Sequence, residues 1–149
     1  MIYLNKNIIT IQEGVIAHGV NCTGAMNSGV AKAIREKWPE VYRFYRSCPT
    51  GKRVLGMAFE VQVAPSLYVI NCYTQVFYGH NGRFANLKAV EHSVQQAYNY
   101  ADYHHLPLYM PKIGCGRGGL SWEQEVEPVI NELDESYSRV DTYICEWKE

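Results

Sequence analysis

The chain has 149 residues, of which 47% are apolar and 19% charged, so it is long enough for one folded domain and too apolar for disorder. Its net charge of −1 offers no overall attraction for polyanions, and we expect no general nucleic-acid binding. No apolar run is long enough to cross a bilayer and no signal-peptide pattern opens the chain, so we expect a cytoplasmic protein without a membrane partner.

The five cysteines are widely spaced and form no Cys-x-x-Cys pair, which argues against a zinc knuckle or a redox pair. We expect all five to be reduced: Cys22, Cys48, Cys72, Cys115 and Cys145. No pattern of metal ligands stands out elsewhere, so we expect no metal and no cofactor.

The first half of the chain predicts two strands followed by two helices. Residues 2–4 form a short strand, and residues 15–20 are an apolar run typical of a strand that is covered on both faces. Apolar residues at helical spacing predict a helix over residues 28–38, which Pro39 interrupts, and a short helix over 41–46.

The second half alternates strands and helices. We expect strands at 54–63 and 67–73, a helix at 84–103, a strand at 107–113, a helix at 122–138 and a strand at 142–146. Ser121 and Gln124 have capping-box spacing, and Pro128 predicts an irregular first turn in the last helix. Strands that alternate with helices predict an α/β fold with a mostly parallel sheet covered on both faces.

Two glycine-rich turns join a strand to a helix, at residues 21–29 and 114–119. Such turns bring free backbone N–H groups and the positive end of a helix dipole together, so two facing turns would clamp a diphosphate. Gly114, Gly116 and Gly119 also match the dinucleotide fingerprint G-x-G-x-x-G, but only one helix and one strand follow, too few for a Rossmann unit. A structural turn without a ligand is the alternative, although four glycines in six residues favour close approach of a ligand.

The two turns together resemble those of a macro domain, the ADP-ribose-binding module, over nearly the whole chain. Ala17-His18-Gly19-Val20-Asn21-Cys22, with the following Gly24-x-Met26-x-Ser28-Gly29-Val30-Ala31, is similar to the first ligand loop of one branch. That branch contains ADP-ribose 1''-phosphate phosphatases, the terminal ADP-ribose glycohydrolase and bacterial antitoxins that reverse thymidine modification. Met110-Pro111-Lys112-Ile113-Gly114-Cys115-Gly116, with Trp122 after it, is similar to the second loop. The resemblance implies a single macro domain over residues 1–149, a three-layer α/β/α sandwich with a mixed, mostly parallel central sheet.

The resemblance also implies where a ligand would lie. Asn7 and Ile8 would sit beside the adenine, residues 24–30 would cradle the distal ribose and a phosphate, and residues 112–118 would wrap the diphosphate. Trp147 would pack on the adenine side or serve as a hydrophobic anchor, and Met26 would cover the ligand or fill the core. The expected substrate-binding residues are Asn7, Ile8, Asn21, Gly24, Met26, Ser28, Gly29, Val30, Tyr73, Gln75, Lys112, Ile113, Gly114, Cys115, Gly116, Arg117, Gly118 and Trp147.

Two departures from the glycohydrolase branch bear on the reaction. That branch has a lysine at the end of the strand matching residues 67–73, where this chain has Cys72 or Tyr73, and an aspartate where this chain has Gly118. Without that amine no Schiff-base-like intermediate forms with the opened ribose, which disfavours release of ADP-ribose from glutamate or thymidine.

The catalytic candidates are His18 and Asn21, at the end of the strand that feeds the first loop. A histidine suits acid–base chemistry at neutral pH, and Asn21 would orient a water or hold the distal ribose; a buried histidine that shapes the loop is the alternative for His18. The other histidines, His80, His92, His104 and His105, are expected at the surface.

Three functions remain open. The first is a phosphatase that converts ADP-ribose 1''-phosphate to ADP-ribose, because phosphoryl chemistry asks mainly for positioning and charge stabilisation. The second is a module that binds ADP-ribose without turnover. The third is a hydrolase of ADP-ribosylated macromolecules or of O-acetyl-ADP-ribose. We expect the protein in the cytoplasm of a bacterial or phage-infected cell.

Overall fold

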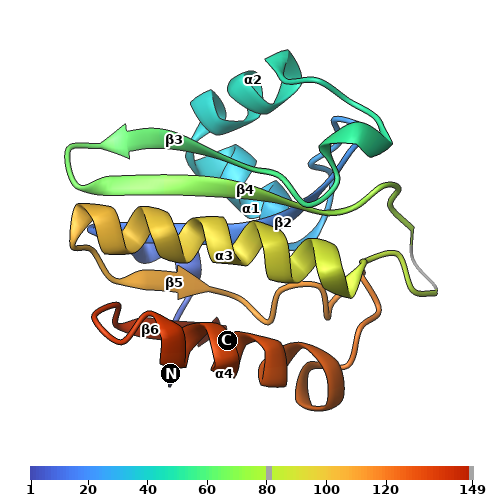
Figure 1. Cartoon of the computed structure of the whole chain (residues 1–149). Coiled ribbons are helices and arrows are strands. Elements are labelled where there is room, and N and C mark those ends of the chain that lie inside the picture. Colours follow the sequence, from blue (N-terminus) through green and yellow to red (C-terminus); the bar gives the residue numbers. More distant parts are fainter. Residues whose placement is uncertain (80–81, 148–149) are drawn as a thin grey trace.

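The computed structural model describes residues 1–79 and 82–147, with a six-stranded sheet at the centre (Figure 1). The strand order is β1–β6–β5–β2–β4–β3. The strands are β1 (Ile2–Asn5), β2 (Gly14–Asn21), β3 (Ala58–Ala64), β4 (Leu67–Gln75), β5 (Leu108–Met110) and β6 (Thr142–Glu146). All neighbours pair in parallel except the β3–β4 hairpin, which confirms the predicted mixed, mostly parallel sheet.

Helices cover both faces of the sheet, which confirms the three-layer sandwich (Figure 1). On one face, α3 (Leu87–His104) and α4 (Glu127–Ser136) bury a cluster that includes Val94 and Ile130. On the other face, α1 (Gly29–Lys37) and α2 (Pro39–Ser47) bury Ile34 and Tyr45. Short helical turns lie at Ile8–Thr10 (η1) and Lys52–Val54 (η2).

Strand β2 lies between these two layers, as its continuous apolar run predicts. Val15 and Ala17 face the α3–α4 cluster, whereas Ile16 and Val20 face the α1–α2 cluster, and all four are buried. Because successive side chains of a strand point to opposite faces, only a strand without polar alternation can fill this position. The carboxyl end of β2 therefore delivers the first glycine turn to one edge of a fully covered sheet.

Three predicted boundaries are wrong by several residues. The strand predicted over 107–113 ends at Met110, because Pro111 has no N–H to donate to a sheet ladder. The strand predicted from residue 54 begins at Ala58, after the η2 turn and Gly56 at φ +87°. Helix α3 begins three residues later than predicted, where the Asn86 side chain accepts a hydrogen bond from the Ala89 N–H.

The helix predicted over 122–138 has the irregular start that Pro128 predicts. A π turn, η3 (Trp122–Val126), precedes α4, and Pro128 stands in the first turn of α4. Ser121 caps the turn by accepting from the Gln124 N–H at 3.3 Å, but the reciprocal acceptor for the Ser121 N–H is Glu125 at 3.0 Å, not Gln124. The π turn advances the register by one residue, so the capping box closes one position later than its sequence pattern indicates.

All five cysteines are free, as expected. Within residues 1–79 and 82–147, no helix combines the length and apolar character that crossing a bilayer requires.

Candidate functional site

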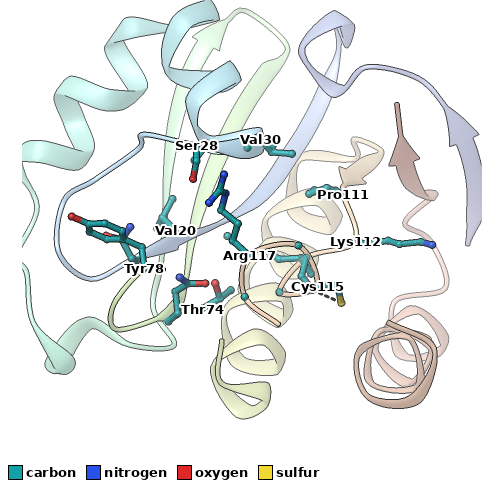
Figure 2. A pocket seen from close by; sticks show the side chains of 18 of the residues that line it. Val20, Ser28, Val30, Thr74, Tyr78, Pro111, Lys112, Cys115 and Arg117 are labelled. Carbon is teal, nitrogen blue, oxygen red and sulfur yellow. Dashed lines mark hydrogen bonds between the residues drawn. The ribbon is translucent and has the colours of Figure 1, made fainter. Parts of the chain in front are cut away.

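A pocket of about 630 Å³ lies at the carboxyl ends of β2, β4 and β5 (Figure 2). This is the edge of a parallel sheet where ligands of open α/β proteins bind. Its walls come from the first turn and the start of α1, the end of β4, the second turn, and the end of β6. Its volume falls within the range of about 300–1,000 Å³ that small-molecule sites occupy.

The first wall is the N-terminus of helix α1, where Ser28, Gly29, Val30 and Ala31 line the pocket. The Ser28 side chain makes no capping hydrogen bond, and the first N–H that bonds back within the helix belongs to Lys32, which donates to the Ser28 carbonyl. The N–H groups before Lys32 are therefore left for a partner outside the helix. With the positive end of the helix dipole behind them, they form a site for an anion.

Asn21 lines the pocket at the end of β2, but its amide is used to fold the first turn. Its Oδ1 accepts from the Thr23 N–H at 3.0 Å and from the Ala25 N–H at 3.4 Å, and its Nδ2 donates to the Ala25 carbonyl at 2.9 Å. An amide with these partners holds the backbone in a turn rather than orienting a water. This geometry favours a role for Asn21 in shaping the loop over the predicted catalytic role.

The second wall is the turn from Lys112 to Gly118, of which every residue lines the pocket. Within the described residues, the N–H groups of Gly114, Gly116 and Gly118 donate to no other protein group. A Cβ on Gly116 would meet nothing within 4 Å, so its backbone lies open to the pocket. The second turn thus offers N–H groups opposite those of α1.

The other three glycines of this turn are explained within the protein. Gly114 and Gly119 have φ near +80°, and a Cβ on Gly119 would overlap the Gly82 carbonyl oxygen. A Cβ on Gly118 would lie 2.5 Å from the Gly114 carbonyl oxygen. Only Gly116 therefore retains the predicted role in close ligand approach. The N-terminus of η3, which follows this turn, is capped by the Ser121 side chain and does not line the pocket, so the predicted helix terminus does not face the ligand site.

Two cationic side chains line the pocket and are placed differently. In Figure 2, Arg117 extends from the second turn toward the start of α1, whereas Lys112 points toward the end of β6. There the Lys112 Nζ lies 3.1 Å from the Glu146 Oε1. Arg117 thus brings positive charge to the side where the α1 N–H groups lie. Cys115, between them, is half-buried, and burial raises the pKa of its thiol to about 11, so it is neutral at pH 7.

His18 does not line the pocket, although its predicted catalytic role would require it to do so. It is fully buried, and its Nε2 lies 2.6 Å from Oδ1 of Asn71 on the neighbouring strand. An amide oxygen only accepts, so Nε2 carries the proton; burial lowers the pKa of His18 to about 4, which keeps it neutral. Its position in β2 alternates with Ala17, so its ring points to the α1–α2 side of the sheet. The structure therefore favours the alternative, a buried structural histidine.

Five other predicted binding residues also lie outside the lining of this pocket. Met26 and Tyr73 are buried in the α1–α2 cluster, which favours core filling for Met26. Gly24 lines a neighbouring depression instead. Asn7 caps η1 by accepting from the Ile9 N–H, and Ile8 is buried beside it.

The remaining predicted residues meet in one place. Those that line the pocket are Asn21, Ser28, Gly29, Val30, Gln75, Lys112, Ile113, Gly114, Cys115, Gly116, Arg117, Gly118 and Trp147. Sequence reasoning missed Thr74 and Tyr78 after the predicted strand and Glu146 at the end of β6. The predicted strand 67–73 ended two residues before β4 does, so Thr74 was not recognised as part of the strand end that lines the pocket; no sequence signal marked Tyr78, which lies beyond that end.

Two of the other histidines lie at the surface, as predicted. His92 and His105 are exposed, His104 is half-buried among tyrosine rings, and His80 lies outside the described residues. No group of three or more metal-ligating side chains occurs within residues 1–79 and 82–147.

The family model of the macro domain matches residues 17–129, from the middle of β2 into α4. The chain belongs to the macro domain family. The matched region includes both glycine turns, and the six-stranded sheet with helices on both faces agrees with the solved macrodomains that it resembles. The family assignment that the two turns predicted is confirmed.

Among curated proteins, the chain is similar to the DNA ADP-ribosyl glycohydrolase of Thermus aquaticus, with 25% identity over 97% of this chain and 40% of that protein. The chain therefore spans about two fifths of the length of this relative. A crystal structure from Bacteroides thetaiotaomicron has 26% identity and a TM-score of 0.83 over 98% of this chain and 99% of that one. Thermosipho africanus DarTG, solved in complex with ADP-ribose, has 18% identity and a TM-score of 0.72 over 89% of this chain and 38% of that one; this similarity shows the fold alone.

Proposed function

We propose that the chain acts as one macro domain whose pocket binds ADP-ribose. One observation carries the proposal: uncommitted N–H groups at the start of α1 face the open backbone of Gly116 across a pocket that also receives Arg117. Opposed backbone donors and an arginine suit a diphosphate, because they supply directed hydrogen bonds and positive charge together. The Thermosipho protein, which shares the fold, was solved in complex with ADP-ribose, and this supports the same ligand.

In this proposal the adenine lies toward Trp147 and the distal ribose toward Asn21 and Gln75. Trp147 is 54% exposed at the end of β6, so its ring is accessible for stacking on a base. Asn21 and Gln75 lie side by side at the ends of β2 and β4, where they pair in the sheet register. The diphosphate then lies between these two ends of the pocket, against the two glycine turns.

The reaction that these groups suit best is hydrolysis of ADP-ribose 1''-phosphate to ADP-ribose and phosphate. Phosphoryl transfer proceeds through positioning and charge stabilisation, which backbone N–H groups and Arg117 supply. The lining lysine, Lys112, is paired with Glu146, so it is poorly placed to form an imine with an opened ribose. The five free cysteines agree with a reducing compartment such as the cytoplasm.

Calorimetry with ADP-ribose tests the binding, and phosphate release from ADP-ribose 1''-phosphate tests the reaction. We expect saturable one-to-one binding that AMP reproduces only weakly, because AMP lacks the second phosphate and the distal ribose. Absence of heat with ADP-ribose would contradict the site. Binding of ADP-ribose without any phosphate release would support the proposed binding site and contradict the proposed phosphatase activity.

A second candidate is hydrolysis of ADP-ribose conjugated to nucleic acid, in line with the name of the Thermus relative. Residues 32–53 hold seven basic and two acidic residues, a net charge of +5, whereas the rest of the chain carries −6. This segment borders a depression lined by Tyr42, Arg46, Phe77 and Tyr78, of which Phe77 is 67% and Tyr78 61% exposed. Exposed aromatic rings beside arginines suit single-stranded nucleic acid. The overall charge of −1, from which we expected no general nucleic-acid binding, conceals this uneven distribution.

The two candidate reactions are separated by incubating the protein with ADP-ribose 1''-phosphate and with an ADP-ribosylated oligonucleotide in parallel. Faster turnover of the oligonucleotide would favour the second candidate and contradict the inference from the missing lysine. Phe77 lines the depression and not the pocket, so Phe77→Ala should slow only the reaction on the oligonucleotide if the depression binds the strand.

A further inference from the structure

Helix α2 contacts the first ligand turn through two consecutive side chains, Tyr45 and Arg46. The Tyr45 hydroxyl donates to the Asn21 carbonyl oxygen at 2.6 Å and lies 2.8 Å from the Asn21 Oδ1. The same hydroxyl oxygen accepts from the Gly24 N–H at 3.2 Å. The Arg46 Nη1 donates to the Gly24 carbonyl at 3.3 Å. Both polar groups of the Gly24 backbone are therefore bonded to α2.

The tyrosine contacts lie in a part of the molecule that excludes water. Tyr45 is 2% exposed, and its ring packs against Tyr73 with centroids 5.9 Å apart. Burial raises the pKa of Tyr45, so the hydroxyl stays protonated and keeps its donor. A buried hydroxyl with several oxygen and nitrogen partners is costly to remove, because its partners are left without water or protein groups to replace it.

The position of these contacts connects them to the pocket. Asn21 and Gly24 stand at the start of the turn that ends at Ser28, and Gly24 takes φ +91°. A glycine has many alternative conformations unless its neighbours restrain it. Because the Gly24 backbone bonds inward to α2, the turn leaves the N–H groups of Ser28 and Gly29 for the pocket. A turn without this restraint would sample conformations in which those groups do not converge.

We infer that Tyr45, assisted by Arg46, is a positioning residue that holds the first turn in its ligand-binding conformation. The inference rests on the proposed binding of ADP-ribose. Tyr45 does not line the pocket, so it acts on the ligand only through Asn21 and Gly24.

Tyr45→Phe tests the inference, because it removes the hydroxyl and keeps the ring. We expect the dissociation constant for ADP-ribose to rise about tenfold, which corresponds to the loss of one or two hydrogen bonds. In the free protein, the Gly24 N–H should exchange with solvent several times faster than in the wild type. Tyr98→Phe is the matched control: Tyr98 is fully buried on the opposite side of the sheet, and its hydroxyl bonds Asp134 at 3.2 Å. The Tyr98→Phe variant should be less stable than the wild type and should bind ADP-ribose with unchanged affinity.

A folded Tyr45→Phe variant with wild-type affinity and wild-type exchange at Gly24 would overturn the inference. If the wild type fails to bind ADP-ribose, the proposed function is lost, and exchange at Gly24 in the free protein still decides whether Tyr45 restrains the turn. If Tyr45→Phe does not fold, Arg46→Gln replaces it, because Arg46 is exposed and its loss should still accelerate exchange at Gly24 and raise the dissociation constant about threefold. Unchanged values in that variant would equally reject the positioning role of α2.

Discussion

Acidification should destabilise this protein through His18 at a pH where most of its carboxyl groups are still ionised. The imidazole is buried between the sheet and the α1–α2 layer, where Nε2 bonds Asn71 and, within the described residues, Nδ1 has no partner. Burial lowers its pKa from 6.5 to about 4, although the hydrogen bond to Asn71 opposes this shift. The unfolded chain therefore takes up a proton between pH 6.5 and pH 4 that the folded chain does not.

The direction in which the free energy of unfolding changes with pH follows from proton linkage. Because the unfolded state binds more protons in this interval, the free energy of unfolding falls as the pH falls, and the stability is fully present above pH 6.5. Each pKa unit corresponds to about 1.4 kcal/mol, so the full effect is about 3 kcal/mol, of which about 2 kcal/mol is lost at pH 5. Glu125, whose pKa Arg83 lowers to about 2, titrates in a lower interval and does not obscure this effect.

Urea unfolding, followed by the fluorescence of the buried Trp38 and Trp122, measures the effect at pH 7.5 and pH 5. His18→Gln cannot titrate, so its free energy of unfolding should fall about 2 kcal/mol less than that of the wild type over this interval. Equal losses in the two proteins would refute the reasoning. A reaction rate that depends on a group with pKa near 6.5, and loses that dependence in His18→Gln, would restore the catalytic role.

Three further predictions concern the pocket. Gly116→Ala should change the free energy of unfolding by no more than about 0.5 kcal/mol and weaken ADP-ribose binding about tenfold. Gly119→Ala should lower the free energy of unfolding by more than about 1 kcal/mol, because its Cβ would overlap the Gly82 carbonyl. Urea titrations and calorimetry measure both variants, and equal destabilisation would contradict the different roles of the two glycines. Cys115 should react with iodoacetamide more slowly than a free thiol at pH 7.5, because burial raises its pKa to about 11. ADP-ribose should lower the rate of this reaction further. An equal decrease in the rate with glucose would count against contact between Cys115 and the ligand. Trp147→Ala should weaken ADP-ribose binding and leave binding of ribose 5-phosphate unchanged; a lower melting temperature with unchanged affinity would identify a hydrophobic anchor.

The order of the elements could be predicted because it depends on local pattern. The apolar run of β2 and the helical spacing in α1 and α3 identify these elements without knowledge of their neighbours. The exact ends could not be predicted in the same way. Glu125 closes the cap of η3 in place of Gln124 because the π turn shifts the register, and a π turn has no short sequence signal.

In the candidate site, too, some residues could be predicted from the sequence and others could not. The glycine turns place their own backbone in the pocket, so Ser28, Gly29 and Gly116 could be predicted from the sequence. His18 could not be excluded in that way, because the face that a strand residue points to depends on which layer packs against it.

The sequence alone indicated the two turns that line the pocket, because glycine content and apolar periodicity are local properties of the chain. The family followed from the resemblance of these two turns to the ligand loops of macro domains. Only the tertiary structure decided what each polar side chain does, since that depends on partners distant in sequence. Asn71 keeps His18 in the core, Tyr45 holds Asn21 and Gly24, and Glu146 pairs with Lys112. Each of these contacts joins residues more than twenty positions apart, where no local pattern extends.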